Sequence, residues 1–422
     1  MSNTDAELAR LRQQHEEEAA APKATPASGK YALCLSGGGY RAALFHLGSL
    51  LRLHELGQLA DLALISSVSG GSIVSAWLVH RHLESRRTDE LFSDWCRRID
   101  FRETVVEPFR SVVDRDRRTS LWFRTFAYNW LAPSRRVRLL ERSYAEIFGD
   151  RSLGDLPDHP RIVICATNLT FGVNWEFSNE RVGDYLTGYF EGGKSFPIAR
   201  AVAASSSFPP VFGPVVLKQA PGSFRGGAYD GGDANALRSR IELTDGGVYD
   251  NLASEPALRR YDRVLISDAG APFPFHASRR YLRRLLRYTE VIGNQAGALR
   301  RRLFHASRHH GVFEGAYWSL SGPPDAGADG YSRGFIQDHL ARIRTDLDRF
   351  TESEFRTLIN HGYFSCQNGL DEAGLLPERS PQTSWPWPDS AHESELKNRL
   401  RSSGNRILHG RWLGRDRINS SP

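Results

Sequence analysis

The chain has 422 residues, of which 40% are hydrophobic, 25% charged and 11% aromatic. This composition is ordinary for a globular protein and excludes a chain that is disordered, collagen-like or coiled-coil throughout. The net charge of +6 rests on arginine, because only five of the 55 basic residues are lysine. Such an excess favours contacts with phosphate groups, although a GC-rich genome would produce it as well.

Four cysteines, Cys34, Cys96, Cys165 and Cys366, are scattered through the chain without a CxxC pair. This spacing predicts free, buried thiols in a reducing compartment, and neither a zinc site nor a disulfide framework. An acidic run at 16–18 stands where a signal peptide would need a basic start and an apolar core. We therefore expect a cytoplasmic protein without a bound metal or other cofactor.

In chain order, the first expected elements are a flexible tail over residues 1–29 and a buried strand over 31–35. A helix follows and ends at Gly57. The stretch 62–79 has no charge and reaches the length of a membrane span. Its serines and glycine pair instead indicate a strand at 62–65, a turn and a helix from residue 72. Two strand–turn–helix units predict an α/β fold with a parallel sheet.

Farther along, residues 84–160 are expected to be largely helical, with an aromatic cluster at 122–130 that would serve as core or as an interfacial lid. Further strands are expected at 162–166, 241–244 and 264–267. The glycine-rich segment 215–235 is interpreted as a long loop. A leucine stripe predicts a helix around 282–292, and Thr351 with Glu354 forms a capping box before another helix.

A serine turn joins the second strand to its helix. Residues 66–71 read SSVSGG, and a nucleophilic serine needs such a tight turn bordered by small residues. The usual pattern is G-x-S-x-G, and here Ser67 replaces the first glycine. The segment is also compatible with a plain connection, so Ser69 is a candidate nucleophile that requires support from elsewhere.

A second turn contains Gly37, Gly38 and Gly39 and leaves backbone N–H groups free at a helix N-terminus, where anions bind readily. The anion is either a phosphate or the oxyanion of an acyl transfer. The turn also fits a loose dinucleotide fingerprint, but the acid expected about twenty residues later is missing. An oxyanion hole beside a serine nucleophile accounts for both turns together.

The candidate base is Asp245, because none of the 14 histidines stands in a recognisable triad. It ends a predicted strand, and open α/β sheets place their sites at the carboxyl ends of strands. Burial raises the pKa of an aspartate and suits it to general base work. A second DGG triplet begins at Asp230 inside the glycine-rich loop, and Asp268 ends another strand; we prefer Asp245 to both.

Four segments resemble the patatin-like phospholipase family in their order and separation. They are residues 36–41 around the glycine turn, 68–72 around the serine turn, 204–212, and 245–251. The resemblance covers about residues 30–270. It implies a three-layer α/β/α fold with a mainly parallel central sheet, and an acyl hydrolase with a Ser/Asp dyad that needs no calcium for its chemistry.

By position, the resemblance makes Ser69 the nucleophile and Asp245 the base. It implies an oxyanion hole made by Gly37, Gly38, Gly39 and Arg41. Supporting roles in the elbow and the dyad fall to Gly70, Gly71, Gly246 and Gly247. The implied activity is that of a lipid acyl hydrolase of the phospholipase A type, which forms an acyl-enzyme and releases fatty acid.

We expect a catalytic domain over residues 30–310 and a mostly helical extension over 311–422 with a mobile end. Three alternatives remain open for the function. They are a lipase or transacylase acting on neutral esters, an effector hydrolase that needs an activating ligand, and, in a different class, a nucleotide-binding oxidoreductase.

Residues 276–310 hold nine arginines and a single acid, Glu290. This stretch either docks peripherally on anionic lipid headgroups at the inner membrane surface or is a solvated face whose arginine stems cover a core helix. No nucleic-acid-binding motif accompanies the charge. The expected partners are therefore a phospholipid or other acyl ester and, through this stretch, an anionic membrane.

Overall fold

The computed structural model describes residues 31–114, 133–190, 192–209, 211–273, 281–322 and 328–401. The expected tail at 1–29, the aromatic cluster at 122–130 and the expected mobile end beyond residue 401 lie outside these residues. Within the described ranges, eleven strands form one sheet. They are β1 (Tyr31–Leu35), β2 (Leu62–Val68), β3 (Arg161–Asn168), β4 (Val173–Phe177), β5 (Val182–Asp184), β6 (Gly188–Phe190), β7 (Val215–Lys218), β8 (Phe224–Arg225), β9 (Arg240–Asp245), β10 (Arg263–Asp268) and β11 (Glu314–Ser319).

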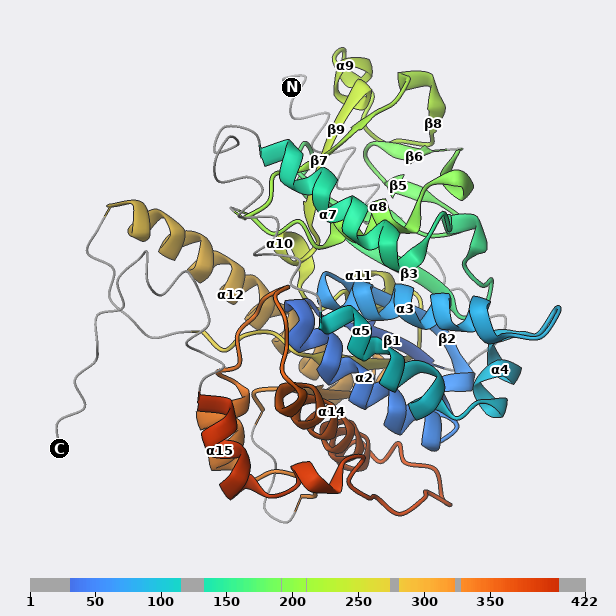
Figure 1. Cartoon of the computed structure of the whole chain (residues 1–422). Helices are drawn as coiled ribbons and strands as arrows, with labels where there is room; N and C mark the ends of the chain where they lie inside the picture. Colours follow the sequence, from blue (N-terminus) through green and yellow to red (C-terminus); the bar gives the residue numbers. More distant parts are fainter. Residues whose placement is uncertain are drawn as a thin grey trace.

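Helices of very different length surround this sheet (Figure 1). They are α2 (Gly39–Glu55), α3 (Gly70–Ser85), α4 (Phe92–Arg98), α5 (Arg110–Val113), α7 (Pro133–Phe148), α8 (Ile198–Ser205), α9 (Ala234–Ser239), α10 (Gly247–Asp250), α11 (Glu255–Leu258), α12 (Tyr281–His309), α13 (Arg333–Phe335), α14 (Glu352–Glu372) and α15 (Glu393–Arg401). The predicted capping box is confirmed at the start of α14, where Thr351 and Glu354 exchange side-chain to backbone hydrogen bonds.

The sheet is parallel in its core and antiparallel beyond it. Its order is β11-β10-β1-β2-β3-β4-β5-β6-β8, while β9 pairs with β3 and β7 with β9. The five strands from β11 to β3 run parallel to one another. From β3 onward every described pairing is antiparallel. This confirms the predicted α/β class with a mainly parallel central sheet.

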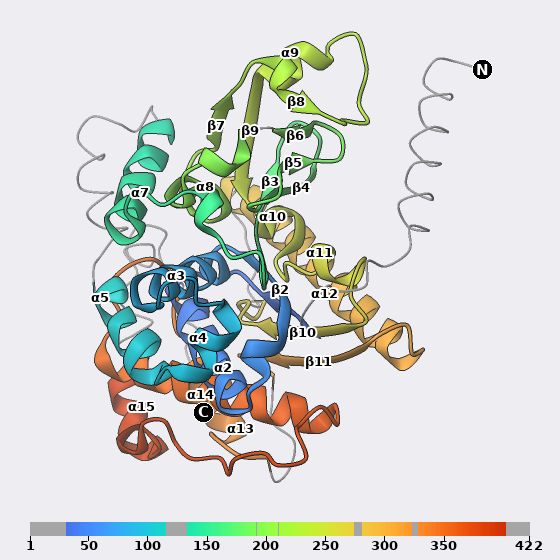
Figure 2. The ribbon, with the colours of Figure 1, turned by 90° about the vertical axis from the view of Figure 1, so that its right-hand side faces the viewer.

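Helices cover both faces of the parallel core and make three layers (Figure 2). Successive residues of β1 point to opposite faces, as the pleat requires. Leu33 and Leu35 pack in the cluster that includes α2, α3 and α14. Ala32 and Cys34 pack in the second cluster, with residues of α11 and α12. Because both faces are covered, the strands read as continuous apolar runs rather than alternating ones.

Two sequence-based boundaries differ from the structure. The segment 215–235 is not a single loop, because it contains β7, which pairs with β9, and the short strand β8. The boundary expected after residue 310 falls inside the architecture, because β11 pairs in parallel with β10 and α14 packs along α2. Both differences arise from pairing with distant residues, which composition alone does not show.

The uncharged stretch 62–79 divides as expected into a strand and a helix, β2 and α3. Among the described residues, no helix combines the length and the apolar character that a membrane crossing requires. All four cysteines are free and buried, in agreement with the prediction from their spacing.

Candidate active site

The two candidate dyad residues meet where β2 and β9 approach each other along β3. The last residue of β2, Val68, pairs with Cys165 of β3. The next residue of β3, Ala166, pairs with Asp245, the last residue of β9. Since β2 runs parallel to β3 and β9 antiparallel to it, the two strands end at the same point from opposite directions. Ser69 and Asp245 therefore leave their strands side by side.

Ser69 forms the whole turn between β2 and α3. The strand runs to Val68 and the helix begins at Gly70, so the turn is tighter than the expected span of residues 66–71. Its backbone has φ 52° and ψ −115°, in a region that side chains other than glycine rarely adopt. This strained conformation is the one that a nucleophile elbow requires in order to expose its hydroxyl.

Hydrogen bonds to serine hydroxyls fix the backbone of the Ser69 turn. The Ser69 N–H donates to Ser205 Oγ at 2.9 Å, and Ser205 Oγ donates to the Cys165 carbonyl at 2.6 Å. Ser72 Oγ lies 2.8 Å from Ser205 Oγ. Sequence reasoning quoted Ser205 only as part of a family segment and gave it no role. The sequence feature that could have pointed to Ser205 is the serine run at 205–207, which ends a helix that packs on β3.

The structure explains why Ser67 can replace the first glycine of the usual elbow pattern. Ser67 belongs to β2 and is fully buried, so it takes no part in the strained turn. Its hydroxyl lies 2.8 Å from Ser75 Oγ and 3.3 Å from the Val163 carbonyl. A hydroxyl satisfied in this way fits the interior without leaving an unpaired polar group.

Asp245 is a buried carboxyl with an unusually high proton affinity. Burial raises its pKa from 3.8 to about 7, while the Gly247 N–H and the Ser69 hydroxyl act to lower it. The Gly247 N–H donates to Oδ1 at 2.7 Å. Oδ2 is buried and, among the described residues, has no hydrogen-bond partner at ordinary geometry. A carboxyl with that pKa is suited to accept a proton near neutral pH.

The other aspartates considered from the sequence have different surroundings. Asp230 is exposed in the glycine-rich segment. Asp268 accepts hydrogen bonds from the Gly270 N–H at 2.8 Å and the Tyr317 hydroxyl at 2.6 Å. Neither has the combination of burial and proximity to Ser69 that distinguishes Asp245.

The three glycine amides of the first turn are not equivalent. The Gly37 N–H already donates to the Asn251 carbonyl at 3.1 Å. No partner for the N–H groups of Gly38 and Gly39 occurs among the described residues. These two amides lie at the start of α2, where the helix dipole favours negative charge. The structure thus leaves two of the three predicted donors free to bind an anion.

The two turns are packed backbone to backbone, and this contact requires their glycines. A Cβ on Gly70 would lie 2.2 Å from the Gly39 carbonyl oxygen, and a Cβ on Gly71 would lie 2.3 Å from that of Leu35. Near the base, a Cβ on Gly246 would lie 2.6 Å from the Cys165 carbonyl oxygen. The glycine-rich sequence therefore brings the free amides next to the serine elbow.

Arg41 supports the loop from inside the protein. The side chain is 1% exposed, and its guanidinium donates to the carbonyls of Ile343 at 3.0 Å and Ala269 at 2.9 Å. Burial lowers its pKa to about 10, which still leaves it protonated at neutral pH. The structure thus gives Arg41 a position that anchors the start of α2, while its buried Nε–H has no hydrogen-bond partner among the described residues.

Residues 341–350 pass over the same loop. The Tyr40 N–H donates to the Asp346 carbonyl at 2.9 Å, and a Cβ on Gly39 would lie 2.6 Å from that oxygen. Arg344 holds this segment through buried ion pairs with Asp348, at 2.6 Å, and with Glu354 of α14. The region beyond residue 310 thus contributes directly to the shape of the glycine loop.

His46 has a structural position beneath the glycine loop. Its ring nitrogens lie 2.8 Å from Ser267 Oγ and 2.9 Å from the Ser36 carbonyl oxygen. Burial lowers its pKa to about 4, so the ring is neutral at physiological pH. Among the described residues, no group of three or more His, Cys, Asp or Glu side chains could hold a metal ion.

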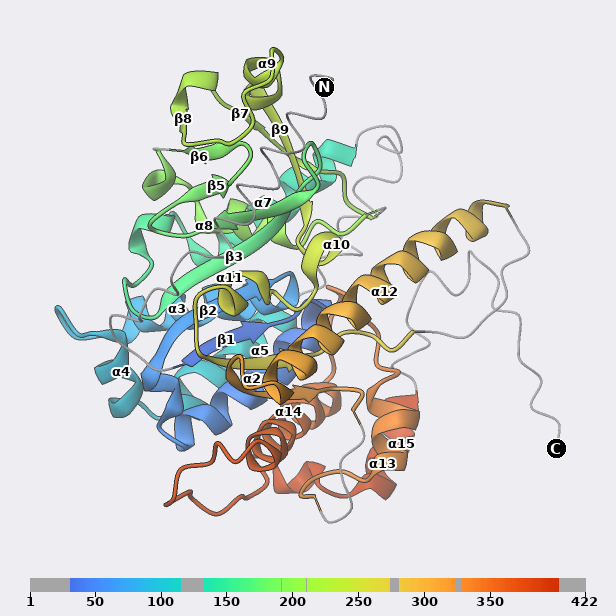
Figure 3. The ribbon, with the colours of Figure 1, turned by 180° about the vertical axis from the view of Figure 1, so that it is seen from behind.

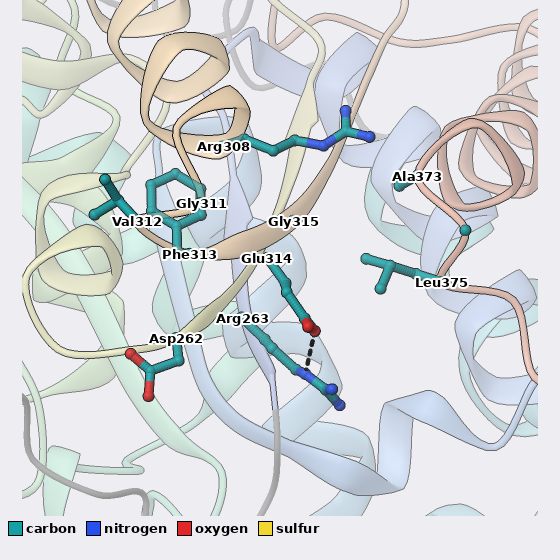
Figure 4. Close-up of a pocket in the computed structure, with 11 residues that line it drawn as sticks. Asp262, Arg263, Arg308, Gly311, Val312, Phe313, Glu314, Gly315, Ala373 and Leu375 are labelled. Carbon is teal, nitrogen blue, oxygen red and sulfur yellow. Dashed lines mark ion pairs between the residues drawn. The ribbon is translucent and has the colours of Figure 1, made fainter.

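An open hollow of about 930 Å³ lies away from these residues, at the amino ends of β10 and β11 (Figure 4). Arg263 and Glu314 form an ion pair of 2.7 Å across its floor. Ser69 follows the carboxyl end of β2, so it lies at the opposite end of the parallel strands. The hollow is therefore not part of the candidate active site.

Comparisons with known proteins were made for sequence and for structure. A model of the patatin-like phospholipase family matches residues 33–258, more than half of the chain. Human GIVD cytosolic phospholipase A2 has a similar structure at 15% identity and a TM-score of 0.48, with 89% of this chain and 64% of that chain covered. The chain thus spans a little under two thirds of that protein's length.

A second similar structure is VipD from Legionella pneumophila, with 14% identity and a TM-score of 0.36. That alignment covers 83% of this chain and 68% of the VipD chain. No match was found among curated protein sequences.

Proposed function

The chain belongs to the patatin-like phospholipase family, and from this premise we propose that it is a phospholipase A that acts through Ser69 and Asp245. The observation that carries the proposal is the junction of β2 and β9. There a strained serine turn meets a buried carboxyl whose pKa is raised to about 7. Two unpartnered amides at the start of α2 lie beside this turn, across the contact between Gly70 and Gly39.

In the first half of the reaction, Asp245 accepts the Ser69 hydroxyl proton while Oγ attacks the carbonyl carbon of an acyl ester. The Gly38 and Gly39 N–H groups stabilise the negative charge that develops on the carbonyl oxygen. Protonated Asp245 then gives its proton to the departing alcohol or lysolipid. The product of this half is an acyl-enzyme on Ser69.

In the second half, Asp245 accepts a proton from water as the water attacks the acyl-enzyme. The same two amides stabilise the second oxyanion. Collapse of this intermediate releases the fatty acid, and the proton held by Asp245 returns to Ser69 Oγ. One base therefore serves both halves, so a carboxyl with a pKa close to neutral suits it to act alternately as base and acid.

The test incubates the wild type, Ser69→Ala and Asp245→Asn with mixed phospholipid vesicles in the presence of a chelator. Free fatty acid and lysolipid are measured. Asp230→Asn is the matched control, because it alters the other DGG triplet at an exposed site. We expect release by the wild type and by Asp230→Asn, and none by the two dyad variants.

Two further measurements separate the parts of the proposal. An alkyl fluorophosphonate should phosphonylate Ser69 Oγ in the wild type with loss of fluoride, which adds the mass of the reagent less HF, and should leave Ser69→Ala unlabelled. Activity retained by Ser69→Ala would refute the assignment of the nucleophile. If the wild type cleaves only a short-chain neutral ester, the phospholipase A activity is refuted while the dyad stands.

A further inference from the structure

Helix α12 is the longest helix that the structure describes, and part of it extends beyond the body of the protein (Figures 1 and 3). Its carboxyl-terminal half is anchored. Phe304 is fully buried and packs 5.2 Å from the ring of Phe313, in the core beneath β10. Arg301 forms an ion pair of 3.5 Å with Asp268. Toward its amino terminus, the helix leaves this support.

Most of the large apolar side chains described in α12 are exposed rather than packed against the protein. Tyr288, Ile292, Leu299 and Leu303 are 55%, 68%, 59% and 58% exposed. At 100° per residue these four fall within an arc of about 60°, and the buried Phe304 lies about 130° around the helix from the centre of that arc. They form a stripe about 22 Å long. A surface helix ordinarily turns its apolar stripe toward the core, so this stripe is available to another apolar medium.

The charge around this stripe is strongly positive. The helix contains seven arginines and one acid, Glu290. Arg284 and Arg302 are exposed and flank the stripe at its two ends, on the same side of the helix. Glu290 lies on the other side, where it pairs with Arg287 at 2.9 Å. The outward face therefore combines an apolar centre with positive ends.

We propose that this face of α12, defined by Arg284, Tyr288, Ile292, Leu299 and Leu303 together with Arg302, docks on an anionic lipid bilayer. A helix of this kind lies in the plane of the headgroups, with its apolar side chains among the acyl chains and its arginines on the phosphates. The combination of an exposed apolar stripe with arginines at its ends matches the acyl chains and the phosphates of an anionic membrane. The proposal rests on the proposed function, which requires a lipid aggregate as substrate.

The docking face is joined to the candidate base through Arg300. Its guanidinium donates to the Tyr249 carbonyl at 2.9 Å and lies 3.3 Å from Asp250 Oδ1. Both residues belong to α10, the short helix that begins two residues after Asp245. A helix seated on the membrane would thus hold the dyad segment in a defined position relative to the lipid surface.

The experiment measures binding to sedimenting vesicles in the inactive Ser69→Ala background, so that hydrolysis does not alter the lipid. One set of vesicles is pure phosphatidylcholine, and the other contains phosphatidylglycerol as well. The stripe variant is Ile292→Glu with Leu299→Glu, and the charge variant is Arg284→Glu with Arg302→Glu. Leu91→Glu and Arg97→Glu are the matched controls, because Leu91 is 67% exposed and the Arg97 side chain 57% exposed. Arg97 lies in α4 and Leu91 directly precedes it, and α4 lies on the side of the protein opposite α12 (Figure 1).

We expect binding to the anionic vesicles only, lowered roughly tenfold or more by either α12 variant and unchanged by the controls. Circular dichroism confirms that each variant is folded. Equal binding to both vesicle types, or binding that the α12 variants leave unaltered, would overturn the proposal. So would sedimentation velocity showing a dimer of the parent that the stripe variant converts to a monomer, since a second copy would then occupy the face.

Hydrolysis of a water-soluble short-chain ester, measured with Ser69 intact, keeps this proposal separate from the proposed function. The α12 variants should retain that activity within about twofold, because their side chains lie outside the dyad. If no ester is cleaved but anionic vesicles bind through α12, the proposed function fails and the docking surface stands. If the ester is cleaved but no vesicle binds, the docking surface fails alone.

Discussion

We expect ester hydrolysis to fall as the pH is lowered through 7, because Asp245 must be ionised to accept the Ser69 proton. Its pKa is raised to about 7 by burial. Roughly one tenth of the carboxyl is therefore ionised at pH 6 and roughly one hundredth at pH 5. The measurement is kcat/KM for a water-soluble short-chain ester between pH 5 and 8.5, at constant ionic strength. Below pH 6 the value should drop roughly tenfold per pH unit.

Because of the same raised pKa, the folded protein becomes less stable as the pH rises, whereas hydrolysis becomes faster. The folded protein binds the Asp245 proton more tightly than the unfolded chain does, so stability is lost as the pH rises from about 4 through 7. The difference between the ordinary pKa of 3.8 and the folded-state pKa of about 7 corresponds to a total loss of roughly 4 kcal/mol in the free energy of unfolding. Roughly 2.5 kcal/mol of this loss occurs between pH 5 and pH 8. Asp245→Asn cannot ionise and escapes this loss.

Urea denaturation of the wild type and of Asp245→Asn at pH 5 and pH 8 measures this effect. The variant's free energy of unfolding should rise relative to the wild type by roughly 2.5 kcal/mol between these pH values. Other titrating groups cancel in the difference. A rate profile that is flat from pH 5 to 8 would refute the role of Asp245 as a base of raised pKa. A difference in unfolding free energy that does not change with pH would show that burial does not destabilise its ionised form.

Three other substitutions test the surroundings of the dyad. Gly70→Ala should abolish hydrolysis, because its Cβ would lie 2.2 Å from the Gly39 carbonyl oxygen. Gly222→Ala is the control, because a Cβ at that position meets open space. Equal activity in the two variants would contradict the steric argument. Ser205→Ala removes the hydroxyl that accepts a hydrogen bond from the Ser69 N–H. This variant should lower kcat about tenfold or more with little change in KM. An unchanged kcat would show that Ser205 does not position the elbow. Arg344→Gln leaves two buried carboxylates without their cation. The free energy of unfolding, measured by urea denaturation, should fall by about 3–5 kcal/mol. A fall of less than about 1 kcal/mol would mean that these ion pairs do not hold residues 341–350 over the glycine loop.

Local patterns in the sequence were sufficient to predict the elements that carry the candidate site. The apolar runs correspond to β1, β2 and β10, and the glycine and serine turns follow the first two of these strands. Ser69 could be singled out because an elbow is a local device, made by a strand, one strained residue and a helix. Asp245 could be singled out because it ends a strand, although that inference assumed a parallel strand.

Only the tertiary structure showed how these pieces meet. The strand β9 is antiparallel to β3, and its end reaches Ser69 because it approaches β2 head-on. The use of the Gly37 N–H by Asn251, and the anchoring of Arg41 by Ile343, depend on residues more than 200 positions away. Nothing in the local sequence encodes such contacts, since each is set by how distant elements pack.

The sequence by itself determined the α/β class, the elbow, the glycine loop and the family resemblance, because backbone conformation and side-chain size act over a few neighbouring residues. The tertiary structure decided which amides stay free, how high the pKa of Asp245 rises, and which way α12 turns its apolar face. These properties depend on burial and on contacts between distant segments. They exist only once the chain is folded.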